Sequence, residues 1–251
     1  METTFSVQTL INEAVKDRED RPKERWWATD FGKCLGGAYY SRLGEKGKEK
    51  DDRTYRVFKA GNLFEQFVID TLKSKAQGYE FIQPKTIYLK EHDLAVRPDL
   101  IVKNKETGKQ YVYEFKSCHS DKFWWMEKKG EGPDKHYLMQ TYCELMATGI
   151  EEGRLMYISK DDLCIAEYSI SIHDEEIKMK VLKELQALNE AWRVKVPPPV
   201  EPAIVNGKIN WKAQYCPHHH LCLKNDNWLE EAKQSLIKVK KGGWKKLKTN
   251  K

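Results

Sequence analysis

The pattern of apolar and polar residues predicts strands in the middle of the chain and helices on either side of them. Apolar residues recur at helical spacing in the segments 7–15, 55–72, 135–148 and 174–194. Runs rich in β-branched and aromatic residues predict strands over 80–90, 94–102, 111–118, 154–159 and 164–172. This order predicts an α/β (α+β) fold in which helices flank a central mixed sheet.

The two strands that carry Asp99 and Glu114 are predicted to pair as a β-hairpin, because the residues between them are polar and end in Gly108. Side chains alternate between the faces of a strand, so Glu114 and Lys116 share one face. If the turn centres on Gly108 and the two residues before it, the numbers of opposing residues sum to roughly 213–215. Asp99 then lies opposite Glu114 or Lys116, and the acids converge.

A third acid, Glu65, lies inside the apolar stripe of the helix predicted over 55–72. It stands seven residues after Phe58 and three before Val68, which places all three on one helix face. An ionised carboxylate among apolar side chains is costly unless a cation or strong donors compensate. The alternative is a glutamate at the edge of the stripe whose carboxylate reaches solvent.

Carboxylates beside a lysine are the groups that hold a divalent metal ion next to a phosphate. Carboxylate oxygens suit hard cations such as Mg²⁺, and a nearby lysine can orient water or stabilise developing negative charge. The E-x-K pattern alone is also common as a surface ion pair. The hypothesis of a nuclease site therefore depends on Asp99 in register with Glu114 and on Glu65 upstream of both.

The motif R-P-D, ending at Asp99, followed by E-F-K, beginning at Glu114, resembles the signature of the PD-(D/E)XK nuclease superfamily. From about residue 29 to residue 222 the chain resembles the RecB-like exonucleases, including the CRISPR-associated RecB-type exonucleases and the iron–sulfur AddB nuclease domain. The segment that starts at Gln140 also resembles the Q-x-Q helix of lambda-type exonucleases. RecB-like members usually carry histidine where this chain has Glu65, whereas the lambda-type branch carries glutamate.

The resemblance implies a restriction-endonuclease-like core and a Mg²⁺- or Mn²⁺-dependent deoxyribonuclease. It implies an exonuclease that acts on single-stranded DNA or DNA ends in DNA processing, repair, recombination or CRISPR adaptation. The implied partners are DNA and other nuclease, helicase or CRISPR adaptation proteins, with no membrane. By the same resemblance, the metal ligands are Glu65, Asp99, Glu114 and the backbone carbonyl of Phe115, and the catalytic residues are Asp99, Glu114, Lys116, Gln140 and Tyr142.

Two other function classes stay open. A DNA-binding or adaptor subunit can keep this fold without cleaving DNA, although the intact acidic and lysine set argues against it. A site-specific endonuclease of the same fold needs an element that reads bases, and none is evident. Three aromatic residues in a predicted loop over 121–132, Phe123, Trp124 and Trp125, either stack on unpaired bases or pack under the loop.

Cysteines form a second candidate site. Cys34 lies near the start of the domain, whereas Cys216 and Cys222 flank three histidines beyond a proline-rich segment. Cys118, Cys143 and Cys164 fall in predicted strands or helices and are expected to be buried small hydrophobic residues.

In the iron–sulfur members of the family, one N-terminal and three C-terminal cysteines bind a [4Fe–4S] cluster and join the two ends of the domain. This chain has two C-terminal cysteines, and His219 stands three residues after Cys216. The set Cys34, Cys216, His219 and Cys222 suits structural Zn²⁺ as well as a cluster, and both remain open. The third alternative is that no metal binds here, and that the histidine run is solvated and the cysteines beside it have no shared role.

Composition sets the remaining limits. The formal net charge of +6 comes from a tail, because seven lysines and no acids lie in 238–251 and the remaining residues carry a net charge of −1. Such a tail is usually disordered, and either binds phosphate or only adds solubility. The absence of an apolar leader and of any long apolar run predicts a cytoplasmic protein without structural disulfides.

The predicted domains are an N-terminal helix and charged linker (1–28), the nuclease domain with its Cys-rich closure (29–225), and a C-terminal helix with the basic tail (226–251).

Overall fold

The computed structural model describes residues 6–16 and 23–242, and the side chains of the last five of these are not described. A five-stranded mixed sheet lies at the centre, with strand order β2-β5-β6-β7-β8. Within this sheet only β6 and β7 pair in parallel; the other neighbours are antiparallel. Its strands are β2 (Tyr79–Ile82), β5 (Leu100–Asn104), β6 (Gln110–Cys118), β7 (Glu152–Ser159) and β8 (Ile165–Ser171).

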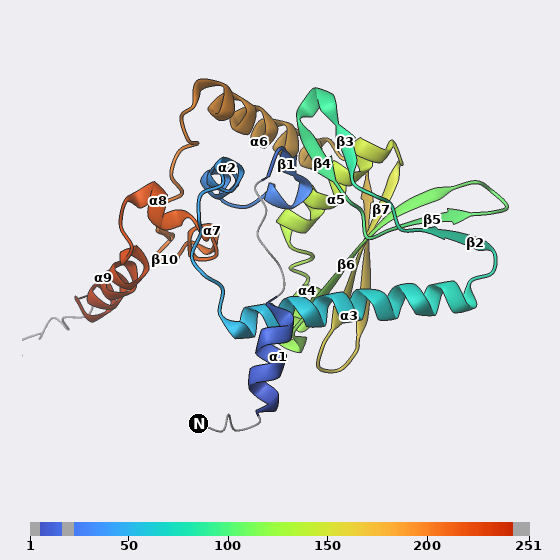
Figure 1. Ribbon diagram of the computed structural model, residues 1–251, viewed down its shortest axis with the longest axis horizontal. Helices are drawn as coiled ribbons and strands as arrows, with labels where there is room; N and C mark the ends of the chain where they lie inside the picture. Colours follow the sequence, from blue (N-terminus) through green and yellow to red (C-terminus); the bar gives the residue numbers. More distant parts are fainter. Residues whose placement is uncertain (1–5, 17–22, 243–251) are drawn as a thin grey trace, which may run out of the picture.

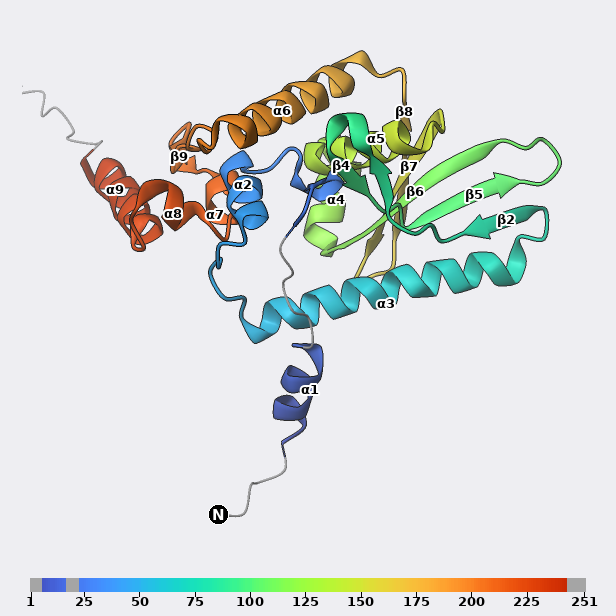
Figure 2. The same cartoon turned by 45° about the horizontal axis from the view of Figure 1, so that its top comes forward.

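Helices cover both faces of this sheet, as Figures 1 and 2 show. The helix α3 (Asp52–Lys75) packs Val68 and Ile69 against one face. The helix α5 (Lys135–Thr148) covers the other face, where Leu145 packs against Val112 and Leu155. The fold class is therefore the predicted one, an α/β fold with a central mixed sheet flanked by helices. The other helices are α1 (Val7–Val15), α2 (Leu35–Leu43), α4 (Ser120–Lys128), α6 (Glu175–Val194), α7 (Trp211–Gln214), α8 (His219–Leu223) and α9 (Trp228–Gly242).

Local sequence signals explain where the long helices begin and end. The Asp51 side chain caps α3 by accepting a hydrogen bond from the Thr54 amide at 2.8 Å. Asp174 caps α6 in the same way, with the Ile177 amide as donor at 3.0 Å. Gly149 ends α5 in the left-handed conformation, with a φ of 70°.

Two strand predictions are wrong in the same way, because each predicted strand is divided between two sheets. The run 94–102 forms β4 (Leu94–Val96) and β5, separated at Pro98, which has no backbone N–H to donate to a neighbouring strand. The run 80–90 forms β2 and β3 (Ile87–Leu89). The strands β3 and β4 join β1 (Trp26–Trp27) in a separate three-stranded sheet, and β9 (Ile204–Val205) pairs with β10 (Lys208–Ile209).

The predicted loop over 121–132 is also wrong, because most of it is the helix α4. Met126 is buried against β7 and α5, so a regular apolar side of the segment faces the core. Trp124 and Trp125 are 45% and 46% exposed on the outer side of this helix. The predicted tail of residues 238–251 begins inside α9, and its last nine residues lie outside the described residues.

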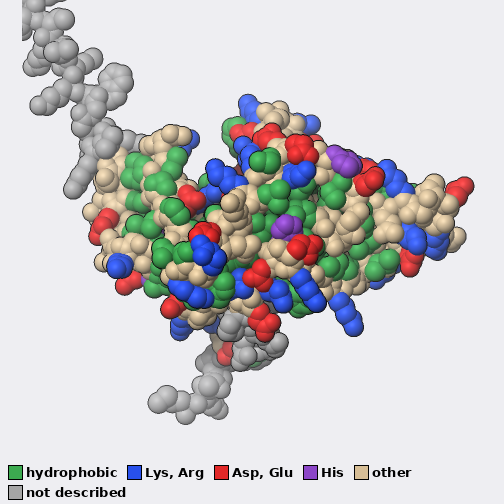
Figure 3. Space-filling model, turned by 90° about the horizontal axis from the view of Figure 1, so that it is seen from above, with side chains coloured by type: hydrophobic (Ala, Val, Ile, Leu, Met, Phe, Trp, Pro, Cys, Tyr) green, Lys and Arg blue, Asp and Glu red, His purple; other side chains and the backbone are tan. Residues whose placement is uncertain are grey.

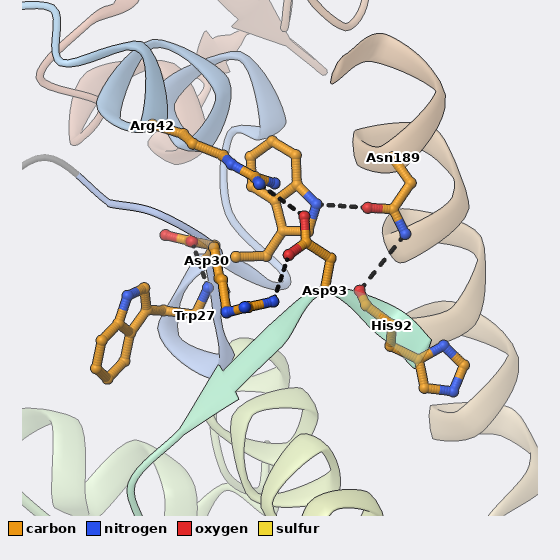
Figure 4. Close-up of polar contacts among 8 residues, drawn as sticks. Trp27, Asp30, Arg42, His92, Asp93 and Asn189 are labelled. Carbon is orange, nitrogen blue, oxygen red and sulfur yellow. Dashed lines mark hydrogen bonds and ion pairs between the residues drawn. The ribbon is translucent and has the colours of Figure 1, made fainter. Parts of the chain in front are cut away.

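A polar cluster joins the N-terminal segment to the core (Figure 4). The Arg42 guanidinium of α2 lies between the rings of Trp26 and Trp192, at 4.3 and 4.2 Å from their centroids. It pairs with the Asp93 carboxylate at 2.7 Å, while the Trp26 indole donates to Asn189 of α6 at 2.7 Å. The cluster thus connects α2, β1, β4 and α6.

Candidate active site

Asp99 is held against the neighbouring strand. It precedes β5 directly, and its Oδ2 accepts a hydrogen bond from the Phe115 amide of β6 at 2.8 Å. The observed pairing of β5 with β6 places Leu100 opposite Tyr113 and Ile101 opposite Val112, which confirms the predicted register. Asp99 therefore lies beside the strand that carries the other two signature residues.

Glu114 and Lys116 project from one face of β6, as the two-residue period predicts. The Lys116 ammonium forms an ion pair with Glu114 Oε1, and it also lies 4.6 Å from the centroid of the Tyr137 ring. Glu114 is 1% exposed. The second carboxylate oxygen of Glu114 is buried and has no hydrogen-bond donor among the described residues.

A further acid, Glu144 of α5, completes this cluster and was not predicted from the sequence. Its side chain is fully buried, and Gln140 Nε2 donates a hydrogen bond to its Oε1 at 3.2 Å. Its other oxygen, Oε2, is buried without a donor in the part of the chain that the structure describes. The available signal was its position four residues after Gln140, on the same helix face, in the middle of an apolar helix.

The charges in this cluster are not balanced. Burial, followed by the charge of Glu114, raises the pKa of Asp99 well above its ordinary value. Burial and the charges of Glu114 and Asp99 do the same to the pKa of Glu144. Burial alone lowers the pKa of Lys116, but Glu114 and Asp99 outweigh it, and the pKa of Lys116 is raised. Three carboxylates therefore share one cluster with a single ammonium group, an arrangement that an additional cation stabilises.

Glu65 reaches the same site from the opposite side. It lies on α3, is half-buried, and lines a cleft of about 610 Å³ together with Asp99, Lys116 and Tyr137. Its charge contributes to the raised pKa of Asp99. The structure thus brings five of the predicted site residues together: Glu65, Asp99, Glu114, Lys116 and Gln140.

The structure does not bring Tyr142 to this cluster. Its hydroxyl donates to the Ile172 carbonyl at 2.9 Å, and its ring is buried between α5 and α6. Residues 140 and 142 are two apart on a helix, so they point to different sides of it. The carbonyl of Phe115 as a metal ligand stays a prediction.

The three candidate cysteines meet around two glycines. A Cβ built on Gly36 of α2 lies 2.9 Å from Cys222 Sγ and 3.8 Å from Cys34 Sγ, and one on Gly37 lies 2.7 Å from Cys216 Sγ. A hydrogen bond from Cys216 lowers the pKa of Cys34 to about 7. Both glycines therefore leave room that sulfur atoms, or a group bound by them, occupy.

The histidines beside these cysteines differ in their contacts. His219 is fully buried, its ring lies 4.4 Å from that of Trp228, and neither ring nitrogen has a hydrogen-bond partner within residues 6–16 and 23–242. His218 Nε2 instead lies 2.9 Å from the Ser41 hydroxyl. Of the other cysteines, Cys143 is buried as predicted. The same prediction is wrong for Cys118, which is half-buried at the end of β6, and for Cys164, which is exposed in the connection between β7 and β8.

Metal sites are not formed as the side chains stand. Within the described ranges, 6–16 and 23–242, no group of three or more His, Cys, Asp or Glu side chains is arranged to hold a metal ion. The unpartnered oxygens of Glu114 and Glu144 and the unpartnered nitrogens of His219 nevertheless have the chemistry of metal ligands. In the same part of the chain, no helix is long and apolar enough to cross a membrane.

Comparison with known proteins shows the fold. No protein-family model matches the sequence, and no curated protein matches it. The alkaline exonuclease LHK-Exo from Laribacter hongkongensis, in complex with dAMP, is similar at a TM-score of 0.48 and 16% identity, over 69% of this chain and 94% of the exonuclease. The solved structure of SSO0001 matches 87% of this chain and 94% of its own, with a TM-score of 0.52 and 21% identity, so this chain shares the fold of SSO0001.

Proposed function

We propose that this protein is a metal-dependent deoxyribonuclease, an exonuclease that hydrolyses phosphodiester bonds of single-stranded DNA or DNA ends. The observation that carries the proposal is the cluster of the buried Glu114 and Glu144 and the half-buried Asp99 beside Lys116, in which Glu114 and Glu144 each have a carboxylate oxygen without a donor among the described residues. A stable core offers no reason to concentrate negative charge in this way, because each unpaired buried charge costs free energy.

In this proposal Asp99 and Glu114, with Glu65 and the Phe115 carbonyl, hold Mg²⁺ or Mn²⁺. When bound, such an ion polarises the scissile phosphate and lowers the pKa of the attacking water. Lys116 stays charged, because its pKa is raised, and it stabilises the negative charge that develops on the phosphate. Gln140 fixes Glu144 beside Glu114 and so keeps the orientation of the acidic cluster.

The shape of the site favours an unpaired strand. Glu114 is buried behind Lys116, so a phosphodiester must enter the cleft to reach it. The side of a duplex presents its phosphates on a wide cylinder, whereas a single strand or a frayed end can enter. Phe58, 45% exposed on the wall of the cleft, offers a surface on which an unpaired base can stack.

We also propose that Cys34, Cys216 and Cys222, with His219, hold a [4Fe–4S] cluster or a structural Zn²⁺. The support is the space that Gly36 and Gly37 leave beside the three sulfur atoms, together with the ring of His219, which is unpartnered among the described residues. Such a centre joins α2 to the segment before α9 and contributes ligation energy to folding.

The direct test of the enzymatic proposal is digestion of end-labelled single- and double-stranded DNA with Mn²⁺, Mg²⁺ or EDTA. Progressive shortening of the single strand, and of the duplex from its ends, with either metal and none with EDTA is the expected result. Discrete internal products contradict the exonuclease and indicate a site-specific endonuclease. Absence of cleavage on every DNA contradicts the enzyme and indicates a DNA-binding or adaptor protein.

A further inference from the structure

Under the proposed nuclease function, individual cations near the candidate active site are the groups to examine as contacts to DNA phosphates. On the face drawn in Figure 3, Lys and Arg side chains are interspersed with Asp and Glu side chains, without a large field of one sign among the described residues. The chain before residue 238 carries a net charge of −1. Lysines without an acidic partner near the candidate active site are therefore the best phosphate contacts.

Lys33 is such a lysine, and its backbone is fixed on both sides. The preceding Gly32 donates its amide to Glu184 Oε2 at 2.7 Å. Gly32 has a φ of 71°, and a Cβ there lies 2.7 Å from the Cα of His136, so the segment is pressed against the start of α5. The following Cys34 is buried at the N-cap of α2.

The Lys33 ammonium has no partner among the described residues. It is half-buried, yet it forms no hydrogen bond or ion pair with any of them. The adjacent acid, Asp30, is already paired with Lys23 at 2.5 Å and accepts the Trp27 amide at 2.9 Å. A half-buried ammonium group that forms no hydrogen bond or ion pair is stabilised when an anion binds beside it.

The residues packed against the Lys33 segment contact residues of the acidic cluster. His136, which the Gly32 backbone contacts, stacks its ring on Tyr137 at 3.9 Å between centroids, and Lys116 lies over the ring of Tyr137. Burial, followed by Lys33, lowers the pKa of His136 to about 4, so His136 is neutral at pH 7. Thr29, four residues before Lys33, lines the catalytic cleft. Contacts therefore connect the segment that carries Lys33, through His136 and Tyr137, to Lys116 at the cleft.

We propose that Lys33 binds a phosphate of the DNA strand next to the phosphate that is hydrolysed. This inference rests on the proposed nuclease function, because it takes the strand to lie in the cleft beside Lys116. Lys116 forms an ion pair with Glu114, whereas Lys33 forms no hydrogen bond or ion pair with the nearby acids Asp30 and Glu114 and can take an external anion. A phosphate on Lys33 sets how far the strand enters, so Lys33 positions the scissile bond. The competing role is structural, in which Lys33 only offsets the charge of the acidic cluster.

The test is binding of a fluorescein-labelled single-stranded oligonucleotide with Ca²⁺ in place of Mn²⁺, at several salt concentrations. The variant Lys33→Gln is expected to bind about tenfold more weakly than wild type, with the slope of log affinity against log salt reduced by about 0.7. Lys33→Arg is expected to bind as wild type does. The matched control is Lys183→Gln, an exposed lysine on α6, which should change neither quantity. Wild-type affinity and salt slope for Lys33→Gln contradict the inference.

A second measurement is made first on wild-type protein, so that its main result does not depend on the folding of a variant. Oligonucleotides that each carry one uncharged methylphosphonate linkage are bound to wild-type protein in turn. One linkage next to the cleavage site should weaken binding about tenfold, and the same linkage should cost nothing further in Lys33→Gln. Equal affinity of wild type for all the linkages contradicts the inference. Failure of the nuclease proposal is distinguishable, because a protein that binds in this way but never cleaves contradicts the nuclease proposal alone.

Discussion

The amide of Phe115 donates a hydrogen bond to the carboxylate of Asp99 at 2.8 Å, which ties the acid before β5 to the strand that carries Glu114 and Lys116. This hydrogen bond fixes the position of Asp99 relative to Glu114 and Lys116, the other residues of the signature. It also leaves the second oxygen of Asp99 and the unpartnered oxygen of Glu114 as the groups that a cation can bind.

Lys116→Ala should abolish cleavage and leave DNA binding nearly unchanged. Lys116 acts on the water and on the charge of the transition state, and its loss should lower the cleavage rate by about a hundredfold or more. Single-turnover cleavage with Mn²⁺ and oligonucleotide binding with Ca²⁺ measure the two effects separately. Lys183→Ala serves as the control for loss of a lysine. A Lys116→Ala protein that cleaves at the wild-type rate would rule out this role.

Glu144→Gln should stabilise the metal-free protein, and increasingly so at higher pH. The pKa of Glu144 is raised in the folded state, so the folded protein holds this proton more tightly than the unfolded chain does. Its contribution to stability is present below the ordinary glutamate pKa, and is lost as pH rises toward the raised value. The amide side chain of the variant cannot ionise and avoids this loss.

Urea unfolding in EDTA between pH 5 and pH 8 measures the difference between wild type and Glu144→Gln. We expect the advantage of the variant to reach about 1–2 kcal/mol at the upper end. The stabilities of the two proteins must be compared with each other, because the lowered pKa of His136 makes the stability of both proteins rise with pH, opposite to the effect of Glu144. An advantage that shrinks as pH rises would contradict the assignment of the raised pKa to Glu144.

Arg42→Ala should destabilise the fold by about 2–4 kcal/mol, because it removes a cation from between two tryptophan rings and an ion pair with Asp93 (Figure 4). The control is Arg193→Ala, whose side chain is 72% exposed on α6, and it should melt close to the wild-type temperature. Thermal unfolding of the two variants makes the comparison. Equal melting temperatures would mean that the cluster contributes nothing to stability.

Replacing Cys34, Cys216 or Cys222 with Ser should release bound metal and lower the melting temperature, because the three sulfur atoms join segments far apart in the chain. Replacing Cys118, Cys143 or Cys164 should release none. Anaerobic purification separates the two candidates: broad absorbance near 400 nm with iron and sulfide identifies a cluster, and a colourless protein with one zinc identifies Zn²⁺. A metal-free protein in which Cys34→Ser melts as wild type does would refute the centre.

The sequence predicted the parts of the site that obey a local period. The register of Asp99 with Glu114, the shared face of Glu114 and Lys116, and the place of Glu65 follow from strand and helix geometry, and the structure agrees. Glu144 and Lys33 were missed because their roles arise from long-range packing. Glu144 becomes important only where α5 crosses β6, and Lys33 only where Gly32 meets His136.

The errors in secondary structure have related physical causes. The hydrophobic run 94–102 is divided at Pro98 between two sheets. The alternation of apolar and polar residues within a strand does not reveal to which sheet the strand belongs. The helix α4 was predicted as a loop, and only the structure shows that Met126 is its buried side while Trp124 and Trp125 are exposed.

The most direct test of the central claim is the Mn²⁺-dependent release of nucleotides from end-labelled single-stranded DNA by wild type, Asp99→Asn and Glu114→Gln, side by side. Both substitutions keep the size of the side chain and remove the charge that holds the metal ion. We predict progressive degradation by wild type and a loss of about a thousandfold or more in each variant, with binding in Ca²⁺ no more than modestly changed. Degradation at the wild-type rate by either variant would contradict the account.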